Sequence, residues 1–150
     1  RGLFHENDVS RLRELGEYIR KTFAVNLALD ADITSDKDNG YDIAGNVRED
    51  TYDSYYKPFD GENEATLSFR FDKPQTVTHV VLKEHIPMSQ RIEKFSVEAK
   101  DTDGKYIKIA SGTTVGYKKI LKFDPYVTDE IRIHILDSRV CPIISFVGIY

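Results

Sequence analysis

The stretch "VVLKEHIPMSQRIEKFSVEAKD", residues 80–101, decides the fold class of this chain. Apolar and polar residues alternate on both sides of a short loop, which predicts two antiparallel β-strands. On the first strand Glu84 continues the apolar face of Leu82, and on the second strand Arg91 continues the apolar face of Phe95. Two opposite charges therefore lie on faces that otherwise point toward a core.

A charge that faces a core is costly unless it is paired and hydrogen-bonded, so we interpret Glu84 and Arg91 as a structural ion pair across the loop. Removal of the Arg91 side chain would then leave Glu84 unpaired and destabilise the fold by about 3 kcal/mol. The alternative is a ligand-facing pair at the mouth of the fold. A catalytic role for Glu84 is disfavoured, because no partner carboxylate is evident.

The rest of the chain extends this β pattern. From residue 66 onward, alternating segments are separated by turns, and Asp101–Lys105 reads as a tight hairpin turn in which Gly104 supplies a positive φ. Pro125 and Pro142 are expected in connections between strands. The pattern predicts a mainly β fold, an antiparallel β-sandwich of about seven strands. The expected strands are residues 66–71, 76–84, 94–100, 105–110, 119–123, 130–136 and 143–150.

One helix is expected before the strands, ending near Ala24. Its apolar side chains recur at spacings of three and four and form one stripe: Val9, Leu12, Leu15, Ile19 and Phe23. This stripe must bury against something. Either the helix packs across the sandwich, or its partner lies outside this chain, which opens without a methionine and reads as a piece of a longer protein.

Composition excludes several functional classes. The formal net charge of −4 disfavours nucleic acid as a partner, and no apolar run has the length of about 20 residues that a membrane helix needs. The four histidines lack zinc-ligand spacing. Cys141 is the only cysteine, so no disulfide forms within the chain, and we expect a small buried apolar side chain there.

Two groups of residues resemble parts of a known family. The first group consists of Gly2, Leu3, Asp8, Val9, Leu12 and Gly16, and it resembles the end of the catalytic domain in α-L-fucosidases of glycoside hydrolase family 29. The second group consists of Leu82, Glu84, Gln90, Arg91, Phe95, Val97 and residues 112–118, and it resembles the discoidin-like (coagulation factor type C) β-sandwich that follows this domain in bacterial members.

The resemblance implies that residues 1–28 form the last helix of a catalytic domain that is not in this chain, and that residues 29–150 form a discoidin-like jelly roll. It implies a non-catalytic accessory region, without catalytic residues of its own, that supports the upstream catalytic barrel of a retaining α-L-fucosidase. The parent protein would be bacterial, periplasmic or extracellular, and would act on fucosylated glycans. The alternative is a stand-alone lectin-like or adhesion module.

Carbohydrate binding needs aromatic faces and fixed polar groups, which the loops supply. The candidate residues are Tyr55, Tyr56, His85, Arg91, Tyr117 and Arg139, with further aromatic faces from Tyr41 and Tyr52. We expect no metal or cofactor. Calcium is the weaker alternative, because Ser54-Tyr55-Tyr56 and Phe146 replace features that fix this region in discoidin-like relatives. The oxygens available for calcium are those of Glu49, Asp50 and Asp53, fewer than the six or more ligands it prefers.

Overall fold

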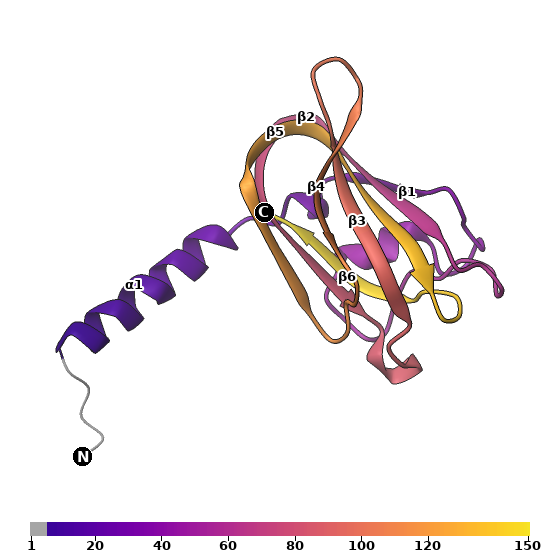
Figure 1. Cartoon of the computed structure of the whole chain (residues 1–150), viewed down its shortest axis with the longest axis horizontal. Helices are drawn as coiled ribbons and strands as arrows, with labels where there is room; N and C mark the ends of the chain where they lie inside the picture. Colours follow the sequence, from indigo (N-terminus) through magenta and orange to yellow (C-terminus); the bar gives the residue numbers. More distant parts are fainter. Residues whose placement is uncertain (1–5) are drawn as a thin grey trace.

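The computed structural model describes residues 6–150, so Gly2 and Leu3 of the resemblance lie outside the described residues. One α-helix is followed by six β-strands, which confirms the predicted fold class (Figure 1). The elements are α1 (Glu6–Thr22), β1 (Asp32–Ser35), β2 (Ala65–Glu84), β3 (Ile92–Lys100), β4 (Tyr106–Gly112), β5 (Lys119–Ser138) and β6 (Ile144–Ile149), with short 3-10 turns η1 (Leu27–Leu29), η2 (Ala44–Arg48) and η3 (Ile86–Met88).

A single antiparallel sheet folds over on itself to make both layers of the sandwich. The strand order is β1-β2-β5-β3-β4, and β6 pairs with β2. The two 20-residue strands β2 and β5 take part in both layers. In one layer the N-terminal half of β2 pairs with the C-terminal half of β5, where Ala65 lies opposite Ile135. In the other layer the C-terminal half of β2 pairs with the N-terminal half of β5, where Leu82 lies opposite Lys119. Figure 1 shows the two strands curving together at one end of the molecule.

The bends explain why the sequence predicts seven separate strands. Residues 66–71 and 76–84 are one continuous strand, β2, and residues 119–123 and 130–136 are another, β5. Register shifts interrupt the β2–β5 ladder between Arg70 and Gln75 and between Val77 and His79. Pro74 and Pro125 lie at these shifts, where no ladder hydrogen bond is lost. The placement of Pro125 in a connection was therefore wrong, since it lies inside β5.

The core lies between the two layers and follows the predicted alternation. Every second residue of the paired strands points inward, so the facing side chains of the two layers interdigitate. Inward-facing side chains that are almost fully buried include Leu67, Phe69, Val80, Leu82, Phe95, Val97, Ile131, Ile133 and Val147.

The predicted turn at Asp101–Lys105 is confirmed. The N–H of Gly104 donates to the carbonyl oxygen of Asp101 at 3.1 Å, and Gly104 has a φ of +83°. A side chain is strained at this backbone angle, so glycine suits the position. No helix among residues 6–150 combines the length and apolar character needed to cross a membrane.

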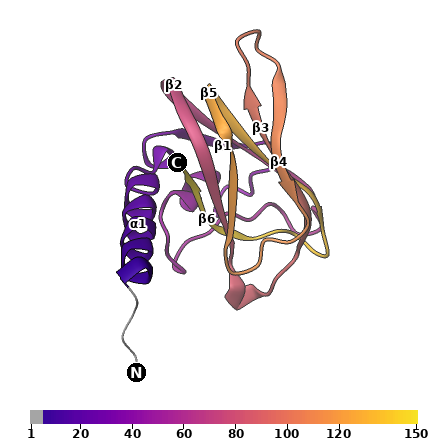
Figure 2. The same ribbon diagram turned by 60° about the vertical axis from the view of Figure 1, so that its left-hand side comes forward.

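Helix α1 projects from the sandwich and meets it only near its C-terminal end (Figures 1 and 2). There the ring of Phe23 packs edge-on against Tyr150 at 4.9 Å and against His79 at 5.4 Å, between ring centroids. The hydroxyl of Tyr18 hydrogen-bonds Nε2 of His79 at 3.3 Å. The rest of the apolar stripe is exposed, and Leu12 and Leu15 each retain 54% of their accessible surface. The helix therefore does not pack across the sandwich.

The segment after α1 belongs structurally to the sandwich. The side-chain oxygen of Asn26 accepts hydrogen bonds from the N–H groups of Ala28 and of Ile149 in β6, each at 3.0 Å. Ala28 is fully buried. The expected boundary after residue 28 stays a prediction, although Asn26 is bonded to β6 and Ala28 is buried.

We predict that deletion of residues 1–21 leaves a cooperatively folded sandwich, because Phe23 and Asn26 remain. Thermal melts should shift by only a few degrees, as expected for about 1 kcal/mol in a domain of this size. Deletion of residues 1–28 is the matched comparison. It removes Asn26 and buried Ala28 and should lower the melting temperature much further. Equal melts for the two truncated chains would contradict this assignment.

Candidate functional site

The candidate binding residues gather at one end of the sandwich, opposite the bends of β2 and β5. We call this the loop end and define it by residues 36–64, 85–91, 113–118 and 139–143. These segments meet there because β2 ends at Glu84, while β3 begins at Ile92 and β6 at Ile144. An isolated bridge between Tyr56 and Ile144 brings the long first loop to the same place.

The carboxylate of Glu84 is the polar centre of the loop end. It is 1% exposed, and its parity on β2 turns it inward as predicted. One oxygen, Oε1, accepts from the backbone N–H groups of Arg91 at 2.7 Å and Ile92 at 2.8 Å. The other, Oε2, accepts from the N–H of Gly116 at 2.8 Å. A single side chain therefore joins the end of β2, the start of β3 and the 113–118 loop.

The predicted ion pair between Glu84 and Arg91 is not found among the ion pairs of residues 6–150. Glu84 contacts the backbone of Arg91 instead of its guanidinium. That guanidinium donates from Nη1 to the carbonyl oxygen of Cys141 at 3.1 Å and from Nε to that of Met88 at 3.0 Å. The physical reason is that three N–H donors already satisfy the buried carboxylate, which leaves the arginine free to fix the 139–143 loop.

Tyr56 cannot face a ligand, because it is completely buried. Its hydroxyl donates to the carbonyl oxygen of Lys37 at 2.5 Å and lies 2.6 Å from Oγ of Ser35. Burial raises the pKa of Tyr56 to about 12, so the phenol stays protonated. This residue fastens the first loop to the core.

Tyr55 and His85 are the two predicted binding residues whose side chains the structure brings together. Their ring centroids lie 4.6 Å apart, and Tyr52 approaches His85 edge-on at 5.8 Å. His85 is buried, and its Nδ1 has no hydrogen-bond partner among the described residues. Burial lowers the pKa of His85, which favours the neutral imidazole.

The remaining predicted binding residues point to other contacts. Tyr117 is exposed, and the ammonium of Lys83 lies 5.4 Å from the centroid of its ring. Arg139 donates from Nη2 to the carbonyl oxygen of Gln90 at 3.0 Å and pairs with Glu93 at 3.5 Å. The six residues thus share one end of the fold without lining one cleft.

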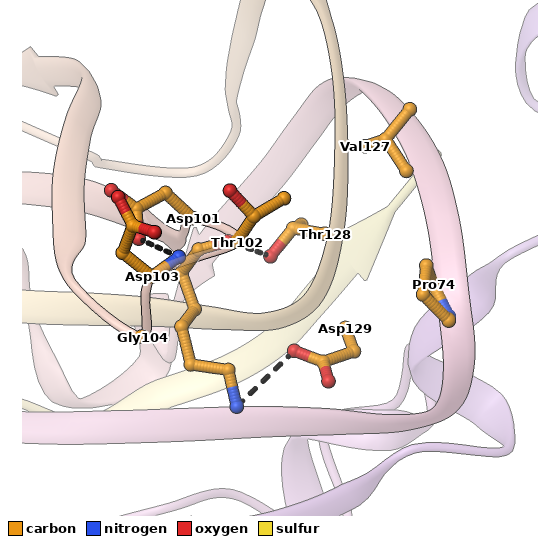
Figure 3. Close-up of a pocket in the computed structure, with 9 residues that line it drawn as sticks. Pro74, Asp101, Thr102, Asp103, Gly104, Val127, Thr128 and Asp129 are labelled. Atoms are coloured by element: carbon orange, nitrogen blue, oxygen red, sulfur yellow. Dashed lines mark hydrogen bonds and ion pairs between the residues drawn. The ribbon is translucent and has the colours of Figure 1, made fainter.

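Several surface hollows remain as possible sites. One, of about 500 Å³, lies at the opposite end between the β3–β4 turn and the bends (Figure 3). Two of its carboxylates are already engaged: Asp101 accepts from the N–H groups of its own turn, and Asp129 pairs with Lys100 at 3.3 Å. A second hollow, of about 570 Å³, lies between α1 and the outer face of β2 and β6. A third, of about 230 Å³, lies in the 36–64 loop beside Tyr41.

Residues 6–150 contain no group of three or more histidine, cysteine, aspartate or glutamate side chains arranged to hold a metal ion. Asp50, a candidate calcium ligand, pairs with Lys83 at 2.7 Å. The expectation about calcium stays a prediction. Cys141 is buried, as expected, and burial raises the pKa of its thiol.

We predict that Glu84→Ala destabilises the protein by about 3 kcal/mol or more, because it leaves three buried N–H groups without an acceptor. Arg91→Ala keeps the backbone N–H that Glu84 binds and should cost only about 1–2 kcal/mol, from its lost bonds to the loop carbonyls. Urea unfolding of both variants measures the difference. An Arg91→Ala variant less stable than Glu84→Ala would favour the ion pair after all.

Known proteins with similar sequence or structure include α-L-fucosidases. No protein-family model matches the chain. Alpha-L-fucosidase 1 of Arabidopsis thaliana is 32% identical over 155 residues, which cover 99% of this chain and 31% of the relative. A GH29 fucosidase of Ruminococcus gnavus, solved in complex with fucose, superposes with a TM-score of 0.87 at 27% identity, over 99% of this chain and 31% of that one.

A more distant neighbour shows the fold alone. A chitosan-binding module from a Paenibacillus chitosanase/glucanase superposes with a TM-score of 0.74 at 16% identity, over 84% of this chain and 98% of the module. The chain spans about a third of the length of the curated relatives that it matches. These relatives include plant as well as bacterial proteins, so the bacterial source stays a prediction. The chain corresponds to the C-terminal part of the α-L-fucosidases of glycoside hydrolase family 29.

Proposed function

We propose that this chain is a non-catalytic accessory region of a larger α-L-fucosidase, which hydrolyses fucosylated glycans, and that it supports the catalytic domain through helix α1. The observation that carries the proposal is the exposed apolar stripe of α1 on a chain that spans about a third of its relatives. A periplasmic or extracellular location of the parent protein belongs to the same proposal.

The stripe is a surface that favours a partner. Burial of one leucine side chain stabilises a protein by about 1.5–3 kcal/mol. Four exposed aliphatic residues on one helix face would therefore contribute a large favourable free energy if a partner covered them. The residues are Val9, Leu12, Leu15 and Ile19. The helix precedes the sandwich in the sequence, so it directly follows the part of the relatives that comes before this region.

The outer face of the layer that contains β6 and the adjoining parts of β2 and β5 continues this apolar surface. The hollow of about 570 Å³ is lined by Ile19 and Phe23 of α1 and by apolar side chains of the sheet. Its sheet side consists of Val81, Ile120, Phe146 and Tyr150, with Lys83, Lys118 and Asp50 at its polar rim. An apolar centre with a charged rim is the usual composition of a domain interface. This supports docking of the catalytic domain on the helix and on this face together.

The buried carboxylates support a non-catalytic role. A retaining glycosidase uses two carboxyl groups about 5–5.5 Å apart, one of which donates a proton. Glu84 is held by three N–H groups, as described above. Burial alone would raise the pKa of Glu130, but hydrogen bonds from Tyr106 and Arg132 and the charge of Arg70 outweigh it and keep the pKa below its ordinary value. Glu130 therefore stays ionised and is a poor proton donor.

We predict that the double variant Leu12→Lys and Leu15→Lys leaves the melting temperature of the 150-residue chain nearly unchanged, because neither side chain is buried in it. In the complete polypeptide, the same variant should lower the melting temperature by several degrees, since loss of two buried leucines costs about 2–5 kcal/mol each. The control is Glu14→Gln with Glu17→Gln, which changes charge equally on the opposite helix face.

Two results would contradict the proposal. The first is a complete polypeptide that melts like wild type with both lysines in place. The second is hydrolysis of 4-nitrophenyl α-L-fucoside by the purified 150-residue chain. A stand-alone lectin-like module is the second candidate, favoured by the exposed aromatic side chains of the loop end. For that candidate the lysine substitutions have no effect in any context.

A further inference from the structure

Two exposed aromatic side chains flank a small hollow on the long first loop. Tyr41 retains 88% and Phe59 retains 61% of its accessible surface. The hollow has a volume of about 230 Å³, and its walls are Asn39, Tyr41, Lys57, Pro58, Phe59 and Asp60. None of these residues lines the groove beside α1, so the two surfaces are separate.

Hydrogen bonds order the two backbone turns that carry these rings, while both rings stay exposed. Oδ1 of Asn39 accepts from the N–H groups of Tyr41 at 2.8 Å and Asp42 at 2.7 Å. Gly40, which lies between Asn39 and Tyr41, has a φ of +81°, an angle that residues with a side chain rarely adopt. Tyr41 therefore stands on a fixed turn, while its ring contributes little to the core.

Phe59 stands on a second turn, which is tied to the first. Its carbonyl oxygen accepts from the N–H of Glu62 at 3.2 Å, and the N–H of Lys57 donates to the carbonyl oxygen of Asp42 at 3.1 Å. The two turns that carry the rings are thus joined by a backbone hydrogen bond. Because these turns are already ordered, little loop entropy remains to be lost on binding.

The polar groups of the hollow carry both charges. Nζ of Lys57 lies 2.9 Å from Oδ1 of Asp60. The hydrogen bond from Lys57 lowers the pKa of Asp60, and the same bond raises the pKa of Lys57, so both stay ionised at neutral pH. The pair leaves ammonium protons and a second carboxylate oxygen for a ligand. Because the two charges cancel, the hollow favours a neutral ligand with several hydroxyl groups.

We propose that Tyr41, Phe59, Lys57 and Asp60 form a binding subsite for one neutral sugar ring of a glycan. The aromatic faces would cover the apolar C–H face of the ring, and the charged pair would bind its hydroxyls. The volume lies below the roughly 300–1,000 Å³ of pockets for drug-sized ligands, which fits one ring better than a longer chain. The proposal deepens the proposed function and rests on it only for the choice of a glycan.

The test is a titration of the 150-residue chain by ¹H–¹⁵N NMR, with methyl α-L-fucoside and 2′-fucosyllactose as the two probes. We expect saturable shifts at the amides of Tyr41, Asp42, Phe59 and Asp60 with one or both probes. Tyr41→Ala and Phe59→Ala should each raise Kd about tenfold, which equals about 1.4 kcal/mol. The matched control is Val140→Ala, because Val140 is 50% exposed at the same end of the fold.

Three outcomes would overturn the subsite. One is the absence of shifts with both sugars, each at about 50 mM, where a site with a Kd of about 10 mM would be mostly filled. Another is saturable shifts centred on Tyr52, Tyr55 and His85 instead. The third is equal weakening by Val140→Ala. None of these bears on docking through α1, which the lysine variants test separately.

Discussion

A buried carboxylate bonded to three backbone N–H groups is the interaction on which the loop end of this protein depends. Glu84 lies on the core face of β2, where an ionised group is tolerated only if its hydrogen bonds are complete. Its partners come from the start of β3 and from the 113–118 loop, so one anion fixes the path of two further segments. Arg91 extends the arrangement through its bonds to the carbonyl oxygens of Met88 and Cys141, which add the 139–143 loop.

The bends in β2 and β5 explain why the contacts of Glu84 and Arg91 lie at one end of the fold. Both strands cross from one layer of the sandwich to the other, so one end of the fold consists largely of continuous strand. The strand ends and the long connections gather at the opposite end. Residues far apart in the sequence, such as Tyr56, Glu84 and Ile144, meet there on a rigid base, which is the usual setting for ligand-binding loops.

The molecule therefore offers two surfaces with different chemistry. The stripe of α1 and the adjoining sheet face are apolar with a charged rim, which suits a protein partner. The hollow between Tyr41 and Phe59 is small, charge-balanced and bordered by aromatic rings, which suits a polyhydroxylated ring. Because the lining residues of the two do not overlap, an accessory region of this kind can dock on one domain and contact a glycan at the same time.

The sequence by itself determined the local features. Period-two alternation gave the sandwich and the inward direction of Glu84, and the 3.6-residue period gave the helix and its apolar stripe, because these patterns depend on residues a few positions apart. Tertiary structure decided what those residues contact. Only the folded chain shows that Pro74 and Pro125 lie within continuous strands, that Tyr56 is buried, and that backbone amides, not the guanidinium of Arg91, bind Glu84. The physical reason is that strand pairing and loop closure join positions up to a hundred or more residues apart. A local sequence pattern therefore does not show which N–H groups will donate to a buried carboxylate.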